Sequence, residues 1–352
     1  MAASTLAEVA KLAGVSQATA SRVLNGSARK PAEGIAERVR DAAASLGYVA
    51  NAQAQALAKS STGLIGLIVH DIADPYFSAI ARGVQAAARQ EHRMVLLATT
   101  DGTPASEKEA VMAFAGRRAE SIILAGSRST RPEDADANAE LAVELDRYCR
   151  NGGRVGTLGQ PVAGVAETGS VHTVGIPHEA LAHELALALA RDHAGPFVIV
   201  GGPEGLATSD ERIRGFQRGL ADAGRPAADV LRTGFNRNGG FDAGNEIARK
   251  LAEEGAPRPC IFACNDVMAI GVAAALREHG LEVPRDAALA GFDDIEWLRD
   301  FQPALSTVVL PLEELGRIAT LGAINVDAGP SAVEGTVVLR HSTSTGSRTG
   351  GN

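Results

Sequence analysis

The first 60 residues carry apolar positions at helical spacing in three short segments. In the first two segments, apolar residues recur every three or four positions, at Leu6, Val9, Ala10 and Ala13 and then at Ala20, Val23 and Leu24. This spacing places them on one face of a helix, and Thr5 and Ser16, just before the segments, are favourable N-cap residues. A third segment runs from about residue 32 to residue 46 and stops at Gly47. The pattern predicts three helices, the first two joined by a tight turn.

From Gly63 onward, short apolar runs alternate with longer amphipathic segments. The runs predicted as strands are 64–69, 94–98, 121–124, 155–158, 197–200, 229–234, 260–263, 287–291 and 307–310. Strands that alternate with helices are typical of parallel sheets covered by helices on both faces. Because about 280 residues exceed one comfortable hydrophobic core, we expect two α/β lobes. The Gly- and Pro-rich stretch 159–169 is the predicted crossing between them.

These patterns divide the chain into an all-α N-terminal domain and an α/β core. We expect the helical domain over 1–50, a linker over 51–61, the core over 62–345 and a frayed tail over 346–352. Within the core, the first lobe is expected to hold 62–160 and 310–334, and the second lobe 161–309 and 335–345.

The composition is typical of a folded protein, with 45% hydrophobic and 22% charged residues. Three cysteines are too few for a disulfide framework, and the chain does not open with a cationic segment followed by an apolar run. Uncharged apolar runs end after about ten residues, half of what a membrane span needs. We therefore expect a cytoplasmic protein that does not enter a membrane.

Charge is distributed unevenly along the chain. Residues 1–60 hold seven Lys and Arg against four Asp and Glu, a net charge of +3, so the overall charge of −8 leaves −11 on the rest. DNA would be attracted to the first segment and repelled by the remainder. A chance fluctuation in a short segment would look the same, so the motifs must decide.

Two helices joined by a tight turn are typical of a helix-turn-helix, whose second helix enters the major groove of DNA. Here that helix would begin with Gln17, Ala18 and Thr19, with Arg22 one turn later. Gln can bond adenine edges, Arg can bond guanine through two donors, and Ala and Thr methyl groups can touch thymine. Hydroxyls suited to phosphate oxygens are those of Ser16, Thr19 and Ser21. On spacing alone, an ordinary capped corner of two helices remains the alternative.

Longer motifs extend this interpretation over nearly the whole chain. The run TLAEVAKLAGVSQATASRVLNG is followed by Glu37-Arg38-Val39, by Leu46-Gly47-Tyr48 and by Asn51. Later motifs are IGLIVHDIADPYFSAIARGVQAAA, ERIRGF (211–216), ACNDVMAIG (263–271), AGFDDIEW (290–297) and PALSTVV (303–309). In these residues and their order, the chain closely resembles the LacI/GalR family of bacterial transcription regulators. The resemblance implies a dimeric repressor with a core like that of periplasmic sugar-binding proteins. Its two lobes would close on a small effector and change the affinity for an inverted-repeat operator.

For DNA, the helix-turn-helix and the resemblance together indicate one set of contacts: Thr5, Ser16, Gln17, Ala18, Thr19, Ser21, Arg22, Asn25, Asn51, Ala54 and Leu57. The segment 51–59 resembles the family's hinge helix, and Leu57 matches a leucine that wedges into the minor groove. Because an isolated helix this short is marginal in water, we expect it to order only with DNA and a partner subunit. Ala50 and Gln55 depart from the common proline and arginine. The alternative role for Leu57 is ordinary core packing.

For the effector, several marked residues follow predicted strands, where clefts form in open α/β lobes. The resemblance matches the following residues to the family's effector site: Asp71, Tyr76, Phe77, Arg212, Phe235, Asn265 and Asp293. A guanidinium, an amide and a carboxylate suit the hydroxyls of a sugar or a related polar metabolite. The alternatives are a surface ion pair for Arg212, an N-cap for Asp293, and core packing for Tyr76 and Phe77.

The chain departs from the family near the predicted crossing. Where many members have an aspartate after the strand, it has Gly156-Thr157-Leu158-Gly159-Gln160, and Pro177-His178 replaces an Asp-Asn pair at the start of the next helix. The effector class therefore cannot be copied from a well-known relative. We interpret His178 as a residue that starts the helix, with a ligand contact as the alternative.

Signatures of enzymes and metal sites are absent from the sequence. It has no G-x-S-x-G elbow, no P-loop and no G-x-G-x-x-G between a strand and a helix. His178 and His183 lie five positions apart, which takes them off a shared metal-binding face. We expect a non-enzyme without cofactor or metal. A solute-binding protein of the same two-lobe fold is the main alternative, but the cationic helix-turn-helix favours the regulator.

Two further expectations concern the second half of the chain. No Leu-rich heptads follow Arg340, so we expect a homodimer without the tetramer-forming extension of some relatives. Trp297 is the only tryptophan and follows Asp293 by four residues. We expect it near the mouth of the effector cleft.

Overall fold

The computed structural model describes residues 4–25, 32–49, 62–165, 169–253, 257–325 and 331–344. Contacts divide the chain into two compact units, residues 1–63 and residues 64–352. Each unit has its own hydrophobic core. Of the helices in these described ranges, none is long and apolar enough to cross a membrane.

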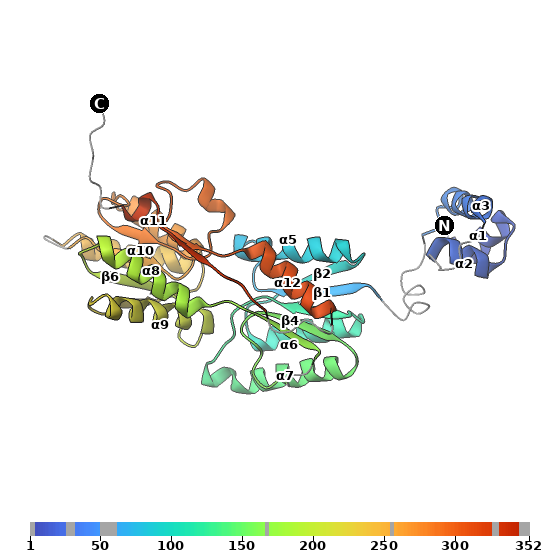
Figure 1. Ribbon diagram of the computed structural model, residues 1–352, viewed down its shortest axis with the longest axis horizontal. Helices are drawn as coiled ribbons and strands as arrows, with labels where there is room; N and C mark the ends of the chain where they lie inside the picture. The colour runs from blue at the N-terminus through green and yellow to red at the C-terminus, as the bar shows by residue number, and fades with distance from the viewer. Residues whose placement is uncertain are drawn as a thin grey trace, which may run out of the picture. The chain divides into compact units, whose positions relative to one another are not determined.

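The N-terminal unit consists of α1 (Leu6–Ala13), α2 (Gln17–Asn25) and α3 (Glu33–Ser45), the three predicted helices (Figure 1). Thr5 caps α1: its hydroxyl accepts a hydrogen bond from the Glu8 N–H at 3.4 Å, and Glu8 Oε2 accepts one from the Thr5 N–H at 2.7 Å. Gly14 ends α1 with a φ of 65°, which allows the sharp turn into α2. The apolar faces meet in a core of Val9, Ala10, Ala13, Ala20, Val39, Ala42 and Ala43.

The first lobe of the larger unit is built on a six-stranded parallel sheet in the order β11-β5-β4-β3-β1-β2. Its strands are β1 (Leu64–Val69), β2 (Met94–Thr99), β3 (Ser121–Leu124), β4 (Arg154–Gly159), β5 (Val171–Gly175) and β11 (Ser331–Ala332). Helices α5 (Pro75–Gln90) and α12 (Leu312–Ile324) cover one face, and α6 (Pro104–Gly116) and α7 (Ala135–Arg150) cover the other (Figure 1). A short 3₁₀ turn, η1 (Pro132–Asp134), precedes α7.

Strand β1 is apolar throughout because its side chains alternate between two faces of the sheet that are both buried. Ile65, Leu67 and Val69 belong to the core under α5 and α12, whereas Ile68 belongs to the core under α6 and α7. Residue 66, between Ile65 and Leu67, must be glycine, because a Cβ there would lie 2.3 Å from the ring of Phe114 on α6.

The second lobe is built on a four-stranded parallel sheet in the order β7-β6-β8-β9. Its strands are β6 (Phe197–Gly201), β7 (Asp229–Arg232), β8 (Cys260–Ala263) and β9 (Ala288–Ala290). Helices α8 (His178–Asp192) and α9 (Ala207–Asp222) pack together, as do α10 (Arg237–Leu251) and α11 (Asp266–Glu278) (Figure 1). An antiparallel pair, β10 (Thr307–Val309) and β12 (Thr336–Val338), and the 3₁₀ turns η2 (Glu296–Arg299) and η3 (His341–Thr343) complete the fold.

The predicted fold class of a helical domain followed by two parallel-sheet lobes is confirmed, but the predicted crossing at 159–169 is wrong. Strand β5 pairs with β4 in the first lobe, so 171–175 does not belong to the second lobe. The chain crosses after β5, just before α8. The strand escaped prediction because His172 and Thr173 interrupt its apolar residues. Both polar side chains are accommodated locally: His172 is buried, and Thr173 Oγ1 lies 2.9 Å from Thr157 Oγ1.

Candidate functional site

Helix α2 presents the predicted base-reading residues to solvent. Gln17, Ala18 and Arg22 are all exposed. Ser16 caps the helix, because its Oγ accepts a hydrogen bond from the Thr19 N–H at 3.1 Å and lies 2.9 Å from Thr19 Oγ1. The first turn of α2 is therefore held in helical geometry before any DNA contact.

The remaining predicted DNA contacts have different surroundings. Thr5 is exposed but its hydroxyl is engaged with Glu8, and Ser21 is half-buried. Asn25 is the last residue of α2. Outside the described residues lie Asn51, Ala54 and Leu57, together with the two hinge departures Ala50 and Gln55.

A cavity of about 390 Å³ lies between the two lobes. All the residues predicted for the effector line it: Asp71, Tyr76, Phe77, Arg212, Phe235, Asn265 and Asp293. Three of them follow β1 in the first lobe, and three more follow β7, β8 and β9 in the second. Because the carboxyl ends of parallel strands meet at one edge of each sheet, residues far apart in sequence converge here.

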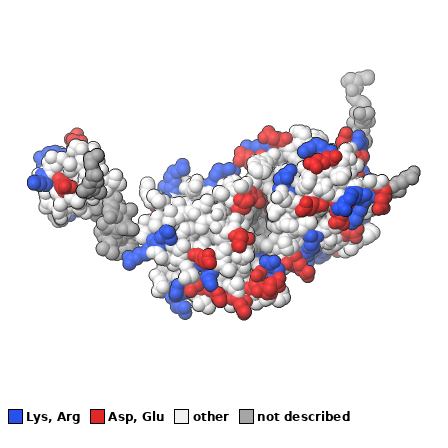
Figure 2. All heavy atoms as spheres, turned by 180° about the vertical axis from the view of Figure 1, so that it is seen from behind, with Lys and Arg blue, Asp and Glu red and all other residues white. Residues whose placement is uncertain are grey.

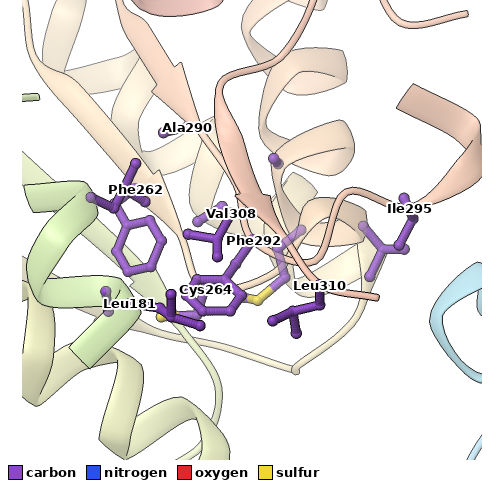
Figure 3. Close-up of a cluster of buried hydrophobic side chains, with 14 of the residues drawn as sticks. Leu181, Phe262, Cys264, Ala290, Phe292, Ile295, Val308 and Leu310 are labelled. Atoms are coloured by element: carbon purple, nitrogen blue, oxygen red, sulfur yellow. The ribbon is translucent and has the colours of Figure 1, made fainter. Parts of the chain in front are cut away.

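Arg212 is the centre of the second-lobe wall. It is 1% exposed, and its Nη2 donates to Asp293 Oδ1 at 2.7 Å while its Nη1 donates to the Cys264 carbonyl at 2.6 Å. The guanidinium carbon lies 3.8 Å from the centre of the Phe292 ring. Figure 3 shows that ring beside Cys264 and Leu181 in the buried apolar cluster.

This geometry removes the alternative roles of both charged residues. Arg212 is not a surface ion pair: its neighbour Asp210 bonds Arg232 at 2.6 Å, while Arg212 reaches into the interior. Asp293 is no N-cap, because Ile295 occupies that position before η2. Burial raises the pKa of Asp293 to about 6, with Arg212 opposing the rise. The pair is an ion pair at neutral pH and loses its negative partner as the pH falls below 6.

His178 both starts α8 and lines the cavity. The imidazole is 2% exposed, and its Nδ1 lies 3.4 Å from Arg212 Nε and 3.3 Å from Arg212 Nη2. Burial and the Arg212 charge lower the pKa of His178 well below its ordinary value. The ring is therefore neutral and accepts from the guanidinium.

Aromatic rings form the apolar part of the wall. Tyr76 and Phe77, at the start of α5, contact each other edge to face with centroids 5.1 Å apart. Phe77 also lies 5.5 Å from the ring of His70. Both side chains of the pair are half-buried and pack against the core as well as lining the cavity, so the two roles predicted for them coexist.

The oxygen and the nitrogen of the Asn265 side chain have different roles, which its position in the sequence did not reveal. Its Oδ1 caps α11 by accepting from the Met268 N–H at 2.8 Å. The amide nitrogen is left as the group that can donate into the cavity. Asp71 similarly accepts from the Ala73 N–H at 2.8 Å through one carboxylate oxygen.

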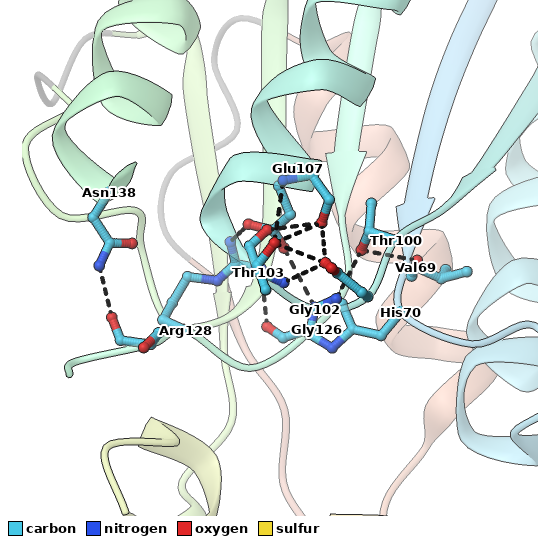
Figure 4. A network of polar contacts seen from close by, with 12 residues as sticks. Val69, His70, Thr100, Gly102, Thr103, Glu107, Gly126, Arg128 and Asn138 are labelled. Carbon is cyan, nitrogen blue, oxygen red and sulfur yellow. Dashed lines mark hydrogen bonds and ion pairs between the residues drawn. The ribbon is translucent and has the colours of Figure 1, made fainter. Parts of the chain in front are cut away.

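A polar network missed by the sequence analysis supports the first-lobe wall (Figure 4). Glu107 on α6 is 3% exposed and lies 3.3 Å from His70 Nε2, while Arg128 Nη1 donates to its other oxygen at 2.5 Å. Burial would raise the pKa of Glu107, but Arg128 and His70 together hold it below its ordinary value. Arg128 Nη2 also donates to the Gly126 carbonyl at 3.1 Å. The network fixes His70 and the loop after β3 against each other.

That loop joins the two lobes directly. The Thr130 N–H donates to the Gly205 carbonyl at 2.8 Å, and the Ala207 N–H donates to the Arg128 carbonyl at 3.0 Å. The Thr208 N–H donates to Ser127 Oγ at 2.9 Å. These contacts, which we name the loop clasp (residues 127–130 with 205–208), hold the lobes together through backbone groups.

The single tryptophan lies outside the cavity wall. Trp297 does not line the cavity and is 54% exposed, although Glu296 beside it pairs with Arg82 of the first lobe at 3.3 Å. Trp297 is therefore not part of the cavity wall, although Ile295 two residues earlier is, and its position near the mouth stays a prediction. Across the described parts of the chain, no group of three or more His, Cys, Asp or Glu is arranged to hold a metal ion.

Comparison with known proteins identifies both units. Residues 5–51 match the family model of bacterial regulatory proteins, lacI family, and residues 186–343 match the periplasmic binding protein-like domain. The solved structure of the transcriptional regulator CelR with cellobiose aligns with a TM-score of 0.67 at 25% identity, over 96% of this chain and 99% of that one. The lac repressor dimer bound to operator and the anti-inducer ONPF aligns with a TM-score of 0.79 at 24% identity, over 97% and 99%.

Relatives match along almost their full lengths. The regulator GalR of Escherichia coli K12 is 28% identical over 351 residues, which cover 97% of this chain and 96% of the relative. The ribose operon repressor of Halalkalibacterium halodurans is 30% identical over 323 residues, which cover 90% of this chain and 88% of the relative. The predicted resemblance is confirmed: this chain belongs to the LacI family of bacterial regulatory proteins.

Proposed function

We propose that this protein is a sequence-specific transcriptional repressor whose binding to an inverted-repeat operator is controlled by a neutral polar effector. The observation that carries the proposal is the buried Arg212–Asp293 pair on the wall of the interlobe cavity. The same chain exposes Gln17, Ala18 and Arg22 on the second helix of a helix-turn-helix. One unit therefore has groups suited to reading DNA, and the other has a site suited to a small molecule.

The charges on the cavity wall disfavour an anionic effector. The wall carries four carboxylates against two guanidinium groups: Asp71, Asp74, Asp101 and Asp293 against Arg131 and Arg212. Arg212 is neutralised by Asp293, and Arg131 pairs with Asp134 at 2.9 Å. An anionic ligand would meet an excess of negative charge, whereas a polyhydroxyl compound finds both donors and acceptors beside aromatic rings.

The relatives support the same class of effector. CelR was solved with cellobiose, and the relative from H. halodurans is named a ribose operon repressor. A cavity of about 390 Å³ has room for a compact sugar. We therefore propose a mono- or disaccharide, or a related polar metabolite.

Homodimerisation is part of the proposal. Strand β2 lies at the edge of its sheet, with Met94 63% and Leu97 44% exposed. An exposed apolar edge strand is unfavourable in a monomer and suits coverage by a second copy of the chain. The lac repressor neighbour is itself a dimer bound to operator. A dimer would present two copies of α2 to the two halves of an inverted repeat.

The proposal is tested with the purified full-length protein. Calorimetric titration with D-ribose, D-galactose and cellobiose, and with ribose 5-phosphate as the anionic control, should show binding of a neutral sugar and none of the phosphate. Selection of bound duplexes from a random DNA library should recover an inverted repeat. Binding of the phosphate alone would contradict the effector class. Recovery of no repeat would favour a solute-binding protein without a regulatory role.

A further inference from the structure

The imidazole of His178 has two nitrogens in different surroundings. Nδ1 faces Arg212, with Nε at 3.4 Å and Nη2 at 3.3 Å. Nε2 has no hydrogen-bond partner among the described residues, although the side chain is 98% buried and belongs to the cavity wall. Because His178 lines the cavity and this nitrogen is not fully buried, a ligand in the cavity can reach it.

The position of Arg212 determines which nitrogen carries the proton. A guanidinium has five N–H donors, no acceptor, and stays protonated in proteins. Nδ1 must therefore present its lone pair to Arg212. In a neutral imidazole the single proton then lies on Nε2. His178 consequently offers an N–H donor to the cavity and no acceptor.

The space in front of this donor is open because residue 159 is glycine. A Cβ on Gly159 would lie 3.7 Å from His178 Nε2, so any larger side chain would extend into that region. Gly159 also has a φ of 81°, a conformation that L side chains rarely adopt. The absence of a side chain at the end of β4 therefore leaves space in front of Nε2–H.

We infer that His178 is a specificity-determining residue that donates its Nε2–H to an acceptor oxygen of the effector in the space beside Gly159. The inference rests on the proposed function, in which a neutral polar effector occupies the cavity. It specifies which chemical groups the site accepts at one position of the effector. A hydroxyl, ring oxygen or carbonyl is accepted there, whereas an ammonium group is disfavoured because its N–H groups would face the N–H donor of His178.

Two substitutions separate this role from mere support of Arg212. In His178→Asn, the amide oxygen can replace Nδ1 as the acceptor for Arg212, but its amide nitrogen falls short of the Nε2 position. In His178→Gln, the amide nitrogen reaches the depth of Nε2, but the acceptor for Arg212 is displaced. If His178 donates to the effector, His178→Asn should reduce effector affinity more than His178→Gln. If His178 only supports Arg212, His178→Gln should reduce the affinity more.

The experiment measures calorimetric affinity of the wild type and both variants for whichever of D-ribose, D-galactose and cellobiose binds the wild type most tightly, and for its deoxy analogues at each position. We expect His178→Asn to lose about tenfold in affinity and His178→Gln to lose less. One deoxy analogue should cost the wild type about tenfold and the Asn variant about twofold or less. The reverse order of the two variants, or equal sensitivity of both proteins to every analogue, overturns the inference.

A ligand-free measurement tests the tautomer by itself. With ¹⁵N-histidine labelling of the full chain, two-bond ¹⁵N–¹H correlations distinguish the Nδ1 and Nε2 tautomers, and His178→Gln assigns the signal among the eight histidines. We expect a neutral ring protonated on Nε2. A proton on Nδ1, or a cationic ring at pH 7, overturns the inference while leaving the proposed function intact. Failure of every neutral sugar to bind the wild type overturns both.

Discussion

Substitution of Arg212 by methionine tests the energetics of the cavity wall. Methionine retains much of the unbranched chain that passes through the core, so little empty volume is created. What disappears is the guanidinium, which bonds Asp293 at 2.7 Å and the Cys264 carbonyl at 2.6 Å. Asp293 is 3% exposed and is left as a buried carboxylate without its cationic partner.

The expected cost follows from that unpaired charge. Removing one member of a buried ion pair typically destabilises a protein by about 3–5 kcal/mol. Because Arg212 opposes the rise of the Asp293 pKa in the wild type, its removal raises that pKa further. At pH 8, Arg212→Met should therefore lower the free energy of unfolding by about 3–5 kcal/mol. At pH 5, where Asp293 takes up a proton, the loss should be smaller.

Urea unfolding of the full chain, followed by Trp297 fluorescence, measures this loss. Trp297 is the only tryptophan and lies in the larger unit, so the signal reports on that unit alone. The matched control is the double variant Arg212→Met with Asp293→Asn, which removes both charges. It should be more stable than the single Arg212→Met protein. A loss below about 1 kcal/mol at pH 8, or a double variant whose loss equals the sum of the single losses, would refute the reasoning.

Three further predictions concern DNA, pH and the loop clasp. Arg22→Ala should weaken operator binding by about 1–3 kcal/mol at fixed salt and relax specificity at one base pair, as measured by fluorescence anisotropy; unchanged affinity and specificity would remove it from the reading set. Because the pKa of Asp293 rises from 3.8 to about 6 on folding, its protonation stabilises the folded state. This contribution is complete below pH 3.8 and is lost as the pH rises through 6, a change of about 3 kcal/mol that urea unfolding should find in the wild type and not in Asp293→Asn. Gly205→Val should reduce effector affinity in calorimetry, since residue 205 belongs to the clasp and a Cβ there would lie 2.4 Å from Cγ of the adjoining Arg131. Gly224→Val, with a similar positive φ and open space around it, should not reduce the affinity. Equal effects of the two substitutions would show backbone strain instead of clasp disruption.

Most helices and strands with a clear apolar pattern were predicted from the sequence. Strands β1 and β3 are apolar on both faces because helices cover both, so they appear as continuous runs. Arg212 and Asp293 were predicted by resemblance, and their direct pairing required the structure, because 81 positions separate them in the chain.

The features that escaped prediction depend on tertiary contacts. Strand β5 is short and half polar, and it is a strand because it pairs with β4. Glu107 lies on a helix whose polar positions give no sign that one of them is buried against Arg128. Two of the three hydrogen bonds of the clasp join backbone groups, which no side-chain pattern encodes. His178 was interpreted as a helix-starting residue, and its second role became visible only once Arg212 was found against its Nδ1.

The central claim is that occupancy of the Arg212–Asp293 cavity changes affinity for DNA. The most direct measurement is the fluorescence anisotropy of a labelled inverted-repeat duplex from the selection, titrated with full-length protein at fixed salt, without sugar and with the sugar at saturation. We predict that the sugar weakens DNA binding by about tenfold or more, a coupling of about 1.4 kcal/mol, and that Arg212→Met abolishes the response while retaining DNA binding. An identical DNA affinity with and without sugar, under conditions in which calorimetry shows the sugar bound, would contradict the account.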